Sequence, residues 1–122
     1  MVRSNFKEGD IVWIKVIPGT AAAKCIIDPG NPESWVFEGK VTFTGRKYIE
    51  INDRLSFDMS QNFKQHSLVD GEEYELYLSK SEAIESIEKR ILFKRLQEIC
   101  FKKEDRDFSL TQLREAVKLL TA

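Results

Sequence analysis

Apolar residues recur at every second position through the first part of the chain, between short clusters of turn residues. Residues 11–17 form a β-branched apolar run, and residues 35–44 give the clearest alternation, with Trp35 and Phe43 on the core side. A period of two is typical of β-strands. We therefore expect strands here, and we expect Gly39, which interrupts the apolar side, to mark a bulge or bend.

Further apolar stretches bring the expected number of strands to about five. They cover residues 47–52, 55–58 and 73–78. Short, twisted antiparallel strands close readily into a small barrel. The long connection 18–34 is expected to add an edge strand over 21–27, while a functional loop remains the alternative.

The spacing of apolar residues becomes helical after residue 78. Ser79 with Glu82, and Ser109 with Gln112, have the spacing of capping boxes, which predicts two helix starts. A long helix is expected over about 80–100, followed by a short one. The long helix carries two apolar faces, so we expect one to pack on the barrel and the other against the final helix.

The predicted organisation is thus α+β. Residues 1–78 form a small antiparallel β-barrel, and residues 79–122 form a helical pair packed on it within one compact domain. The chain has 122 residues, 42% of them hydrophobic and 32% charged, with a net charge of −1. This composition is typical of a folded domain and lacks the large basic excess of a protein that coats nucleic acid.

Few residues suggest catalysis or metal binding. His66 is the only histidine and is expected in a solvated loop, while Cys25 and Cys100 lie in apolar contexts that favour core packing. No motif for nucleotide, metal or cofactor binding is present. We therefore expect no enzyme activity and no cofactor. The chain has neither a signal peptide nor an apolar run for a membrane span, so a cytoplasmic protein without a membrane partner is expected.

Two surfaces are candidates for binding. On the barrel, aromatic rings alternate with cations, as in many proteins that hold oligonucleotides. The rings are Trp13, Trp35, Tyr48, Phe57 and Phe63, and the cations are Lys15, Lys40, Arg46, Lys47, Arg54 and Lys64; of these, Trp13, Lys15, Lys40, Arg46, Lys47 and Tyr48 form the candidate nucleic-acid or partner surface. Ordinary core rings flanked by solvated charges would give the same pattern. On the long helix, the candidate partner surface contains Arg90, Lys94 and Leu96.

Several segments resemble a known group of proteins. Residues 6–13, residues 39–49, the Tyr-Leu-Ser segment at 77–79 and the leucine-rich stretch 109–120 are similar to uncharacterised "β-barrel domain" proteins of phages and prophages of low-GC Gram-positive bacteria. The resemblance implies an SH3-like or Tudor-like barrel and an accessory role in a phage, with location in the host cytosol. It supplies no catalytic or binding residue.

Three functions remain open at this stage. The leading hypothesis is a non-catalytic accessory module that acts through protein–protein contact, for example by inhibiting a host or defence protein, with a homodimer as a further use of the same helix face. The first alternative is nucleic-acid binding by the barrel, with affinity that falls with salt. The second is sequestration of a small anionic ligand.

Overall fold

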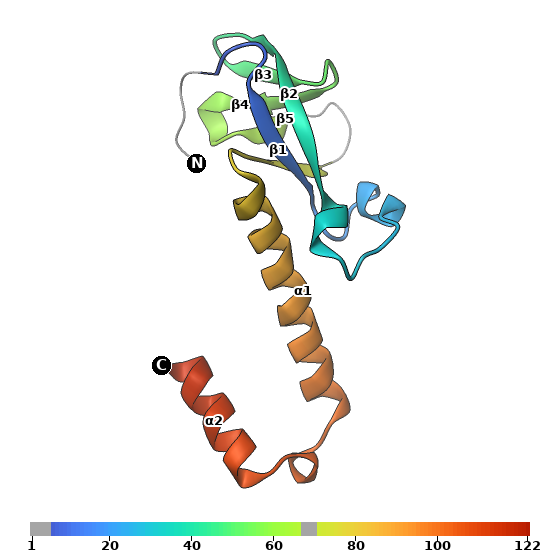
Figure 1. Ribbon diagram of the computed structural model, residues 1–122, viewed down its shortest axis with the longest axis vertical. Helices are drawn as coiled ribbons and strands as arrows, with labels where there is room; N and C mark the ends of the chain where they lie inside the picture. Colours follow the sequence, from blue (N-terminus) through green and yellow to red (C-terminus); the bar gives the residue numbers. More distant parts are fainter. Residues whose placement is uncertain (1–5, 67–70) are drawn as a thin grey trace. The chain divides into compact units, whose positions relative to one another are not determined.

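The computed structural model describes residues 6–66 and 71–122, and it confirms the α+β class (Figure 1). Within these residues, six antiparallel strands form a nearly closed barrel in the order β5-β4-β3-β2-β1-β6. The strands are β1 (Ile11–Val16), β2 (Val36–Thr44), β3 (Tyr48–Ile51), β4 (Leu55–Asp58), β5 (Lys64–His66) and β6 (Tyr74–Tyr77). A long helix, α1 (Lys80–Lys102), and a short one, α2 (Leu110–Thr121), follow as expected.

The barrel core comes from alternate positions of the strands. Its fully buried side chains are Val12, Ile14, Val41, Ile49, Ile51 and Phe57, with Leu55 and Leu76 nearly as buried. Each such side chain contributes about 1.5–3 kcal/mol by leaving water. The period-two pattern therefore identified the core of the barrel correctly.

Phe43 is the exception, because it is 49% exposed although the alternation places it in the core. The β2–β3 register pairs Val41 with Ile51 but Phe43 with Glu50, so a bulge lies between Val41 and Phe43. A bulge adds one residue to a strand and moves the following side chains to the other face. The expectation of an inward Phe43 was wrong for this reason, while Trp35 is buried as predicted.

Gly39 does not mark the bulge. Its partner on β1 is Val12, and the pairing there is regular. A Cβ at this position would lie 2.6 Å from Ile51 Cγ2, 3.2 Å from Ile14 Cγ1 and 3.3 Å from Val12 Cγ2. Glycine is therefore required because core side chains fill the space that a side chain would occupy.

The connection 18–34 contains no strand, so the expected edge strand over 21–27 was wrong. Two short 3-10 helices, Ala22–Cys25 and Pro32–Trp35, occupy this segment instead. The Glu73 carboxylate accepts a hydrogen bond from Ala22 N–H (2.8 Å), and Asn31 Oδ1 accepts one from Glu33 N–H (3.1 Å). These side-chain acceptors satisfy helix N-termini and compete with strand pairing.

The sixth strand, β5, was not predicted. Its sequence Lys-Gln-His has no apolar residue, so no alternation indicates a strand. Asn62 and Phe63, just before it, have positive φ values of 54° and 59° and turn the chain back towards β4. His66 consequently lies in a strand and not in a loop.

Both helices begin at the predicted caps. Ser79 Oγ accepts a hydrogen bond from Glu82 N–H at 3.1 Å. Ser109 and Gln112 bond reciprocally, at 3.0 Å and 2.9 Å, which completes a capping box.

The chain divides into two compact units, which we call the barrel unit (residues 1–89) and the helical unit (residues 90–122). The boundary falls within α1. In the barrel unit, the first part of α1 buries Ala83 and Ile87 completely. The prediction of one compact domain, with residues 79–122 packed on 1–78, stays a prediction.

Both cysteines are exposed and free, so the expectation that Cys25 and Cys100 pack in the core was wrong. Cys25 ends an exposed 3-10 helix, and Cys100 lies on the part of α1 that belongs to the helical unit. Apolar neighbours in the sequence did not indicate burial here because those neighbours are exposed too; Ile27 and Phe101 are examples.

Candidate functional site

Two residues of the candidate barrel surface, Lys15 and Trp13, lie on β1 and differ in how far their side chains are exposed to solvent. Lys15 is only 6% exposed. Its Nζ lies 2.8 Å from Glu75 Oε1 and donates to Ser86 Oγ at 2.8 Å, and the hydroxyl of Tyr77 donates to the same Ser86 Oγ at 3.0 Å. Lys15 on β1 therefore links this strand to β6 through Glu75 and to α1 through Ser86. These two contacts compensate the burial of its charge.

Trp13 is half-buried on the outer face of the barrel. Lys80 Nζ lies 5.5 Å from the centre of its ring, within the range of a cation–π contact. Lys40 is exposed and pairs with Ile11, which is itself 45% exposed. This part of the surface thus combines the half-buried ring of Trp13 with two exposed cations, Lys40 and Lys80.

A second group of rings and cations lies at the β2–β3 hairpin. Lys47 Nζ is 5.4 Å from the ring centre of Tyr48, and the rings of Tyr48 and His66 are 4.6 Å apart at 39°. Arg46, in the hairpin loop, is exposed. The hairpin therefore presents accessible cations next to an aromatic pair, which includes a histidine that the sequence did not place here.

The remaining rings of the sequence-based set serve the core. Trp35, Phe57 and Phe63 are buried, and Trp35 Nε1 donates to the Pro29 carbonyl at 3.0 Å. Trp35 and Phe57 therefore do not reach a ligand on the outer face, whereas Phe63 lines a groove beside β6. The assignment of the other residues as a binding surface stays a prediction.

Asp58 at the end of β4 anchors the turn into β5. Its carboxylate accepts hydrogen bonds from the Ser60 hydroxyl (2.6 Å) and the Ser60 N–H (2.9 Å), and it lies 3.8 Å from Lys47 Nζ. The bond from the Ser60 hydroxyl, together with that from the Ser60 N–H, the charge of Lys47 and the Gln61 N–H, lowers the pKa of Asp58, although burial acts in the opposite direction.

We expect Asp58→Asn to destabilise the protein at neutral pH and much less in acid. A carboxyl with a lowered folded-state pKa stabilises the fold above its ordinary value of 3.8, and this contribution is lost as the pH falls through the still lower pKa of the folded state. Urea unfolding at neutral pH and below pH 3.8 measures the difference. Asp53→Asn, in an exposed turn, is the control. A gap between wild type and Asp58→Asn that stays the same in acid would contradict this role.

On α1, the candidate partner residues do not share one face. Arg90 and Lys94 are four residues apart and lie side by side, while Leu96 lies about 140° around the helix from their midpoint. All three are exposed. Leu96 instead shares a face with Leu92 and Ile99.

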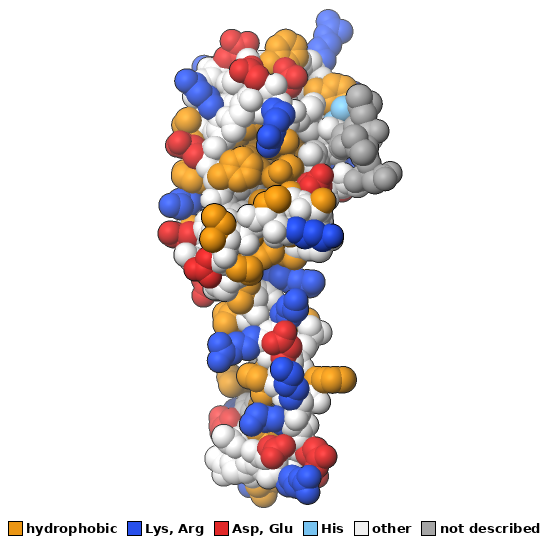
Figure 2. Space-filling view, turned by 90° about the vertical axis from the view of Figure 1, so that its right-hand side faces the viewer, with side chains coloured by type: hydrophobic (Ala, Val, Ile, Leu, Met, Phe, Trp, Pro, Cys, Tyr) orange, Lys and Arg blue, Asp and Glu red, His pale blue; other side chains and the backbone are white. Residues whose placement is uncertain are grey.

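Exposed apolar side chains are concentrated in the helical unit. In Figure 2, hydrophobic side chains of this part of the chain stand at the surface among charged ones. The large exposed ones are Leu92, Phe93, Leu96, Ile99 and Phe101 on α1, and Leu110, Leu113, Val117, Leu119 and Leu120 on α2. Exposed apolar side chains are common at interaction sites, so those of the helical unit form a candidate surface.

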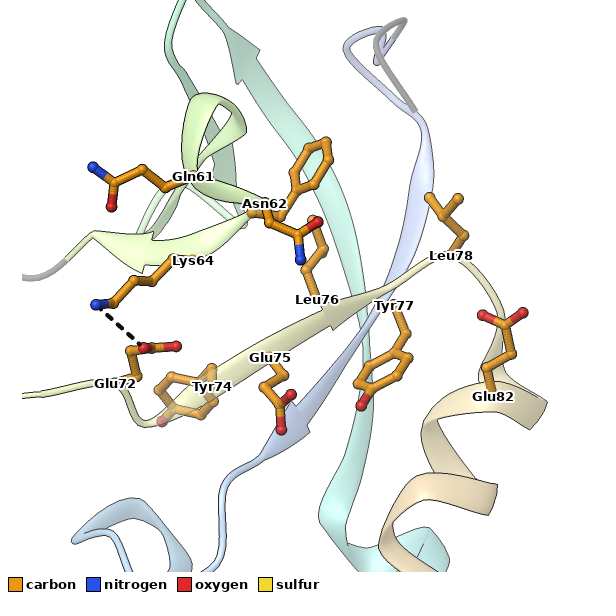
Figure 3. Close-up of a pocket in the computed structure, with 11 residues that line it drawn as sticks. Gln61, Asn62, Lys64, Glu72, Tyr74, Glu75, Leu76, Tyr77, Leu78 and Glu82 are labelled. Atoms are coloured by element: carbon orange, nitrogen blue, oxygen red, sulfur yellow. Dashed lines mark ion pairs between the residues drawn. The ribbon is translucent and has the colours of Figure 1, made fainter. Parts of the chain in front are cut away.

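A groove of about 610 Å³ lies in the barrel unit between the two end strands of the sheet (Figure 3). Its lining comes from β6, from the turn before β5 and from the start of α1. The lining residues are Gln61, Asn62, Phe63, Lys64, Glu72, Tyr74, Glu75, Leu76, Tyr77, Leu78 and Glu82. Among the described lining residues the carboxylates outnumber the cations, which does not suit the anionic ligand considered above. Sequence reasoning missed the groove because β5 carries no strand pattern.

In residues 6–66 and 71–122, no three His, Cys, Asp or Glu side chains come together as a metal site would require. Among the described helices, none combines the length and the apolar character needed to cross a bilayer.

The fold and these surfaces define a small antiparallel barrel domain with a helical C-terminal segment. The chain belongs to the family of phage ProQ C-terminal-like domains, whose model matches residues 1–122. It is therefore a phage-type domain, in agreement with that part of the resemblance noted in the sequence. No curated protein and no solved structure matches the chain, so the SH3-like or Tudor-like assignment stays a prediction.

Proposed function

We propose that this chain is a non-catalytic accessory module that acts by binding another protein through the apolar side chains of the helical unit. The observation that carries the proposal is α2, which has a complete capping box but no buried residue. A helix of twelve residues is marginal alone in water and gains most of its stability by packing an apolar face. A protein partner would provide that packing.

The apolar face of α2 is well defined. Leu110, Leu113, Val117 and Leu120 follow the i, i+3, i+7 and i+10 spacing of one helix face. Leu119 is 76% exposed and lies at least about 100° around the helix from each of them. The two faces therefore offer a matched pair of leucines for mutation.

The charge of the helical unit indicates the chemistry of the partner. Residues 90–122 contain eight Lys and Arg against five Asp and Glu. An excess of basic over acidic side chains favours a partner with an acidic surface and raises the rate of association at low salt. A host or defence protein with such a surface is the partner that we propose.

Capture from a lysate of the bacterial host tests this proposal. We expect tagged wild-type chain and Leu119→Glu to retain the same partner, and Leu113→Glu and Leu96→Glu to lose it by about tenfold or more, because a buried charge at an interface is costly. Sedimentation of the purified chain distinguishes a second copy from a different protein. Equal capture by all variants, without self-association, would remove the helical unit from the function.

Nucleic-acid binding is the second candidate, and the Lys47–Tyr48–His66 group favours it. An exposed cation beside a pair of neighbouring rings is suited to single-stranded bases. If this function is correct, a labelled oligonucleotide binds at low salt, and the triple change of Lys40, Arg46 and Lys47 to Gln weakens binding and flattens its salt dependence. Substitution of Lys24, which lies outside this surface, is the control. No binding at about 50 mM salt eliminates this candidate.

A further inference from the structure

The barrel is left open at one seam, between β5 and β6. Every other neighbouring pair of strands is joined by a backbone ladder, but in the described residues none joins these two. A side chain bridges them instead, since Gln65 Oε1 accepts hydrogen bonds from Glu73 N–H (2.7 Å) and Tyr74 N–H (3.0 Å). Lys64 and Glu72 also face each other across the seam at 3.7 Å (Figure 3).

The backbone of β6 presents hydrogen-bonding groups to this seam. The Glu73 carbonyl accepts from Ile17 N–H (2.9 Å) and so points to the β1 side. In an antiparallel pair, every second residue turns its N–H and C=O to the same neighbour. The backbone N–H and C=O groups of Glu75 and Tyr77 therefore point to β1, whereas those of Tyr74 and Leu76 point to the seam. The hydrogen bond from Tyr74 N–H to Gln65 agrees with this. No described strand pairs with β6 on this side.

The groove lies along the same edge and has suitable side chains. Leu76 and Leu78 provide apolar contacts, and both pack against the barrel core. Among the described lining residues, Glu72 pairs with Lys64 and Glu75 pairs with the buried Lys15, while Glu82, at the start of α1, adds a further carboxylate. A carboxylate beside an apolar strip favours a ligand with alternating apolar and basic side chains.

We propose that the seam binds an extended peptide segment of another protein, which adds as a strand along β6. Backbone hydrogen bonds to Leu76 supply affinity, alternate apolar side chains pack on Leu76 and Leu78, and an intervening lysine or arginine approaches Glu82. This site lies in the barrel unit and does not involve the apolar face of α2, so it can fail while the proposed function of the helical unit stands.

Three synthetic pentapeptides test the proposal on the full chain. They are Val-Lys-Val-Lys-Val, its N-methylated form, which cannot form the strand ladder, and Val-Glu-Val-Glu-Val. We expect the first to bind and to shift the amide resonances of Tyr74 and Leu76, and the other two to bind at least about tenfold more weakly. The Glu82→Lys variant is expected to weaken binding several-fold, while Glu88→Lys, an exposed change on the same helix outside the groove, leaves it unchanged.

Several results would overturn the proposal. They are no binding of Val-Lys-Val-Lys-Val at about 1 mM, equal binding of the N-methylated peptide, or resonance shifts confined to residues outside the seam. The Glu82→Lys change keeps the backbone N–H that the Ser79 cap uses. Thermal unfolding of both variants distinguishes a loss of binding from a loss of stability, because Glu82 also lies in the first turn of α1.

Discussion

Gly39→Val is expected to destabilise the barrel more than any other single change on β2. The added Cβ would meet Ile51, Ile14 and Val12 within the core, at 2.6 Å, 3.2 Å and 3.3 Å. Overpacking of this kind costs about 1–3 kcal/mol for an added methylene, and the branched side chain of valine adds further clashes. Gly39→Ala should also lower the free energy of unfolding, but by less than Gly39→Val. Urea unfolding of both variants measures the free energies.

Gly30→Ala is the control for this prediction. A Cβ at position 30 would approach only Asp28 Oδ1, at 3.9 Å, in an exposed loop. Its free energy of unfolding should remain within about 0.5 kcal/mol of wild type. A Gly39→Val protein as stable as wild type would show that the core at this position has room, which the structure excludes.

Ile87→Ala is expected to lower the free energy of unfolding by about 2–5 kcal/mol. Ile87 is fully buried in the barrel unit, next in register to the fully buried Ala83. Removing its outer carbons leaves a cavity that the packed neighbours cannot fill. The result matters because it measures how firmly the first part of α1 belongs to the barrel unit.

The matched change is Leu92→Ala in the same helix. Leu92 is 57% exposed, so its truncation in the isolated chain should alter stability by no more than about 0.5 kcal/mol. Similar losses for Ile87→Ala and Leu92→Ala would contradict the division of α1 between two units, because both side chains would then contribute equally to one core. Denaturant unfolding followed by circular dichroism compares the two.

The sequence predicted those elements whose patterns depend on burial or on caps. Alternation identified the strands that contain Ile14, Ile49 and Phe57, and serine caps located the starts of α1 and α2. These signals are local, since each follows from the side chains of a few consecutive residues. They were sufficient to predict a barrel followed by two helices.

Other features depend on contacts between distant residues and left no local pattern. The bulge that exposes Phe43 follows from the register of β2 against β3, and the 3-10 helix at Ala22–Cys25 depends on the Glu73 carboxylate far along the chain. The burial of Lys15 depends on Glu75 and Ser86. Lys15, one of the four candidate cations of the barrel surface, therefore makes contacts within the fold that its place in an alternating strand could not reveal.

The candidate sites show the same limit. An amphipathic pattern predicted the apolar face of α2, but it could not distinguish a face that packs within the chain from one that binds a partner. The seam groove was not predicted, because it requires both the sixth strand and the absence of a ladder between β5 and β6 in the described residues. Its acidic lining is scattered over Glu72, Glu75 and Glu82 and becomes a site only in the folded barrel.

Hydrogen exchange of the α2 amides tests the central claim most directly. If a protein partner covers Leu113 and its neighbours, residues 114–121 exchange rapidly in the dilute isolated chain and become protected by about a hundredfold or more when the captured partner is added. The strand amides of β1 to β4 should be protected in both samples. Amides in α2 that are already as protected as those of the strands in the isolated chain, and unchanged by the partner, would contradict the account.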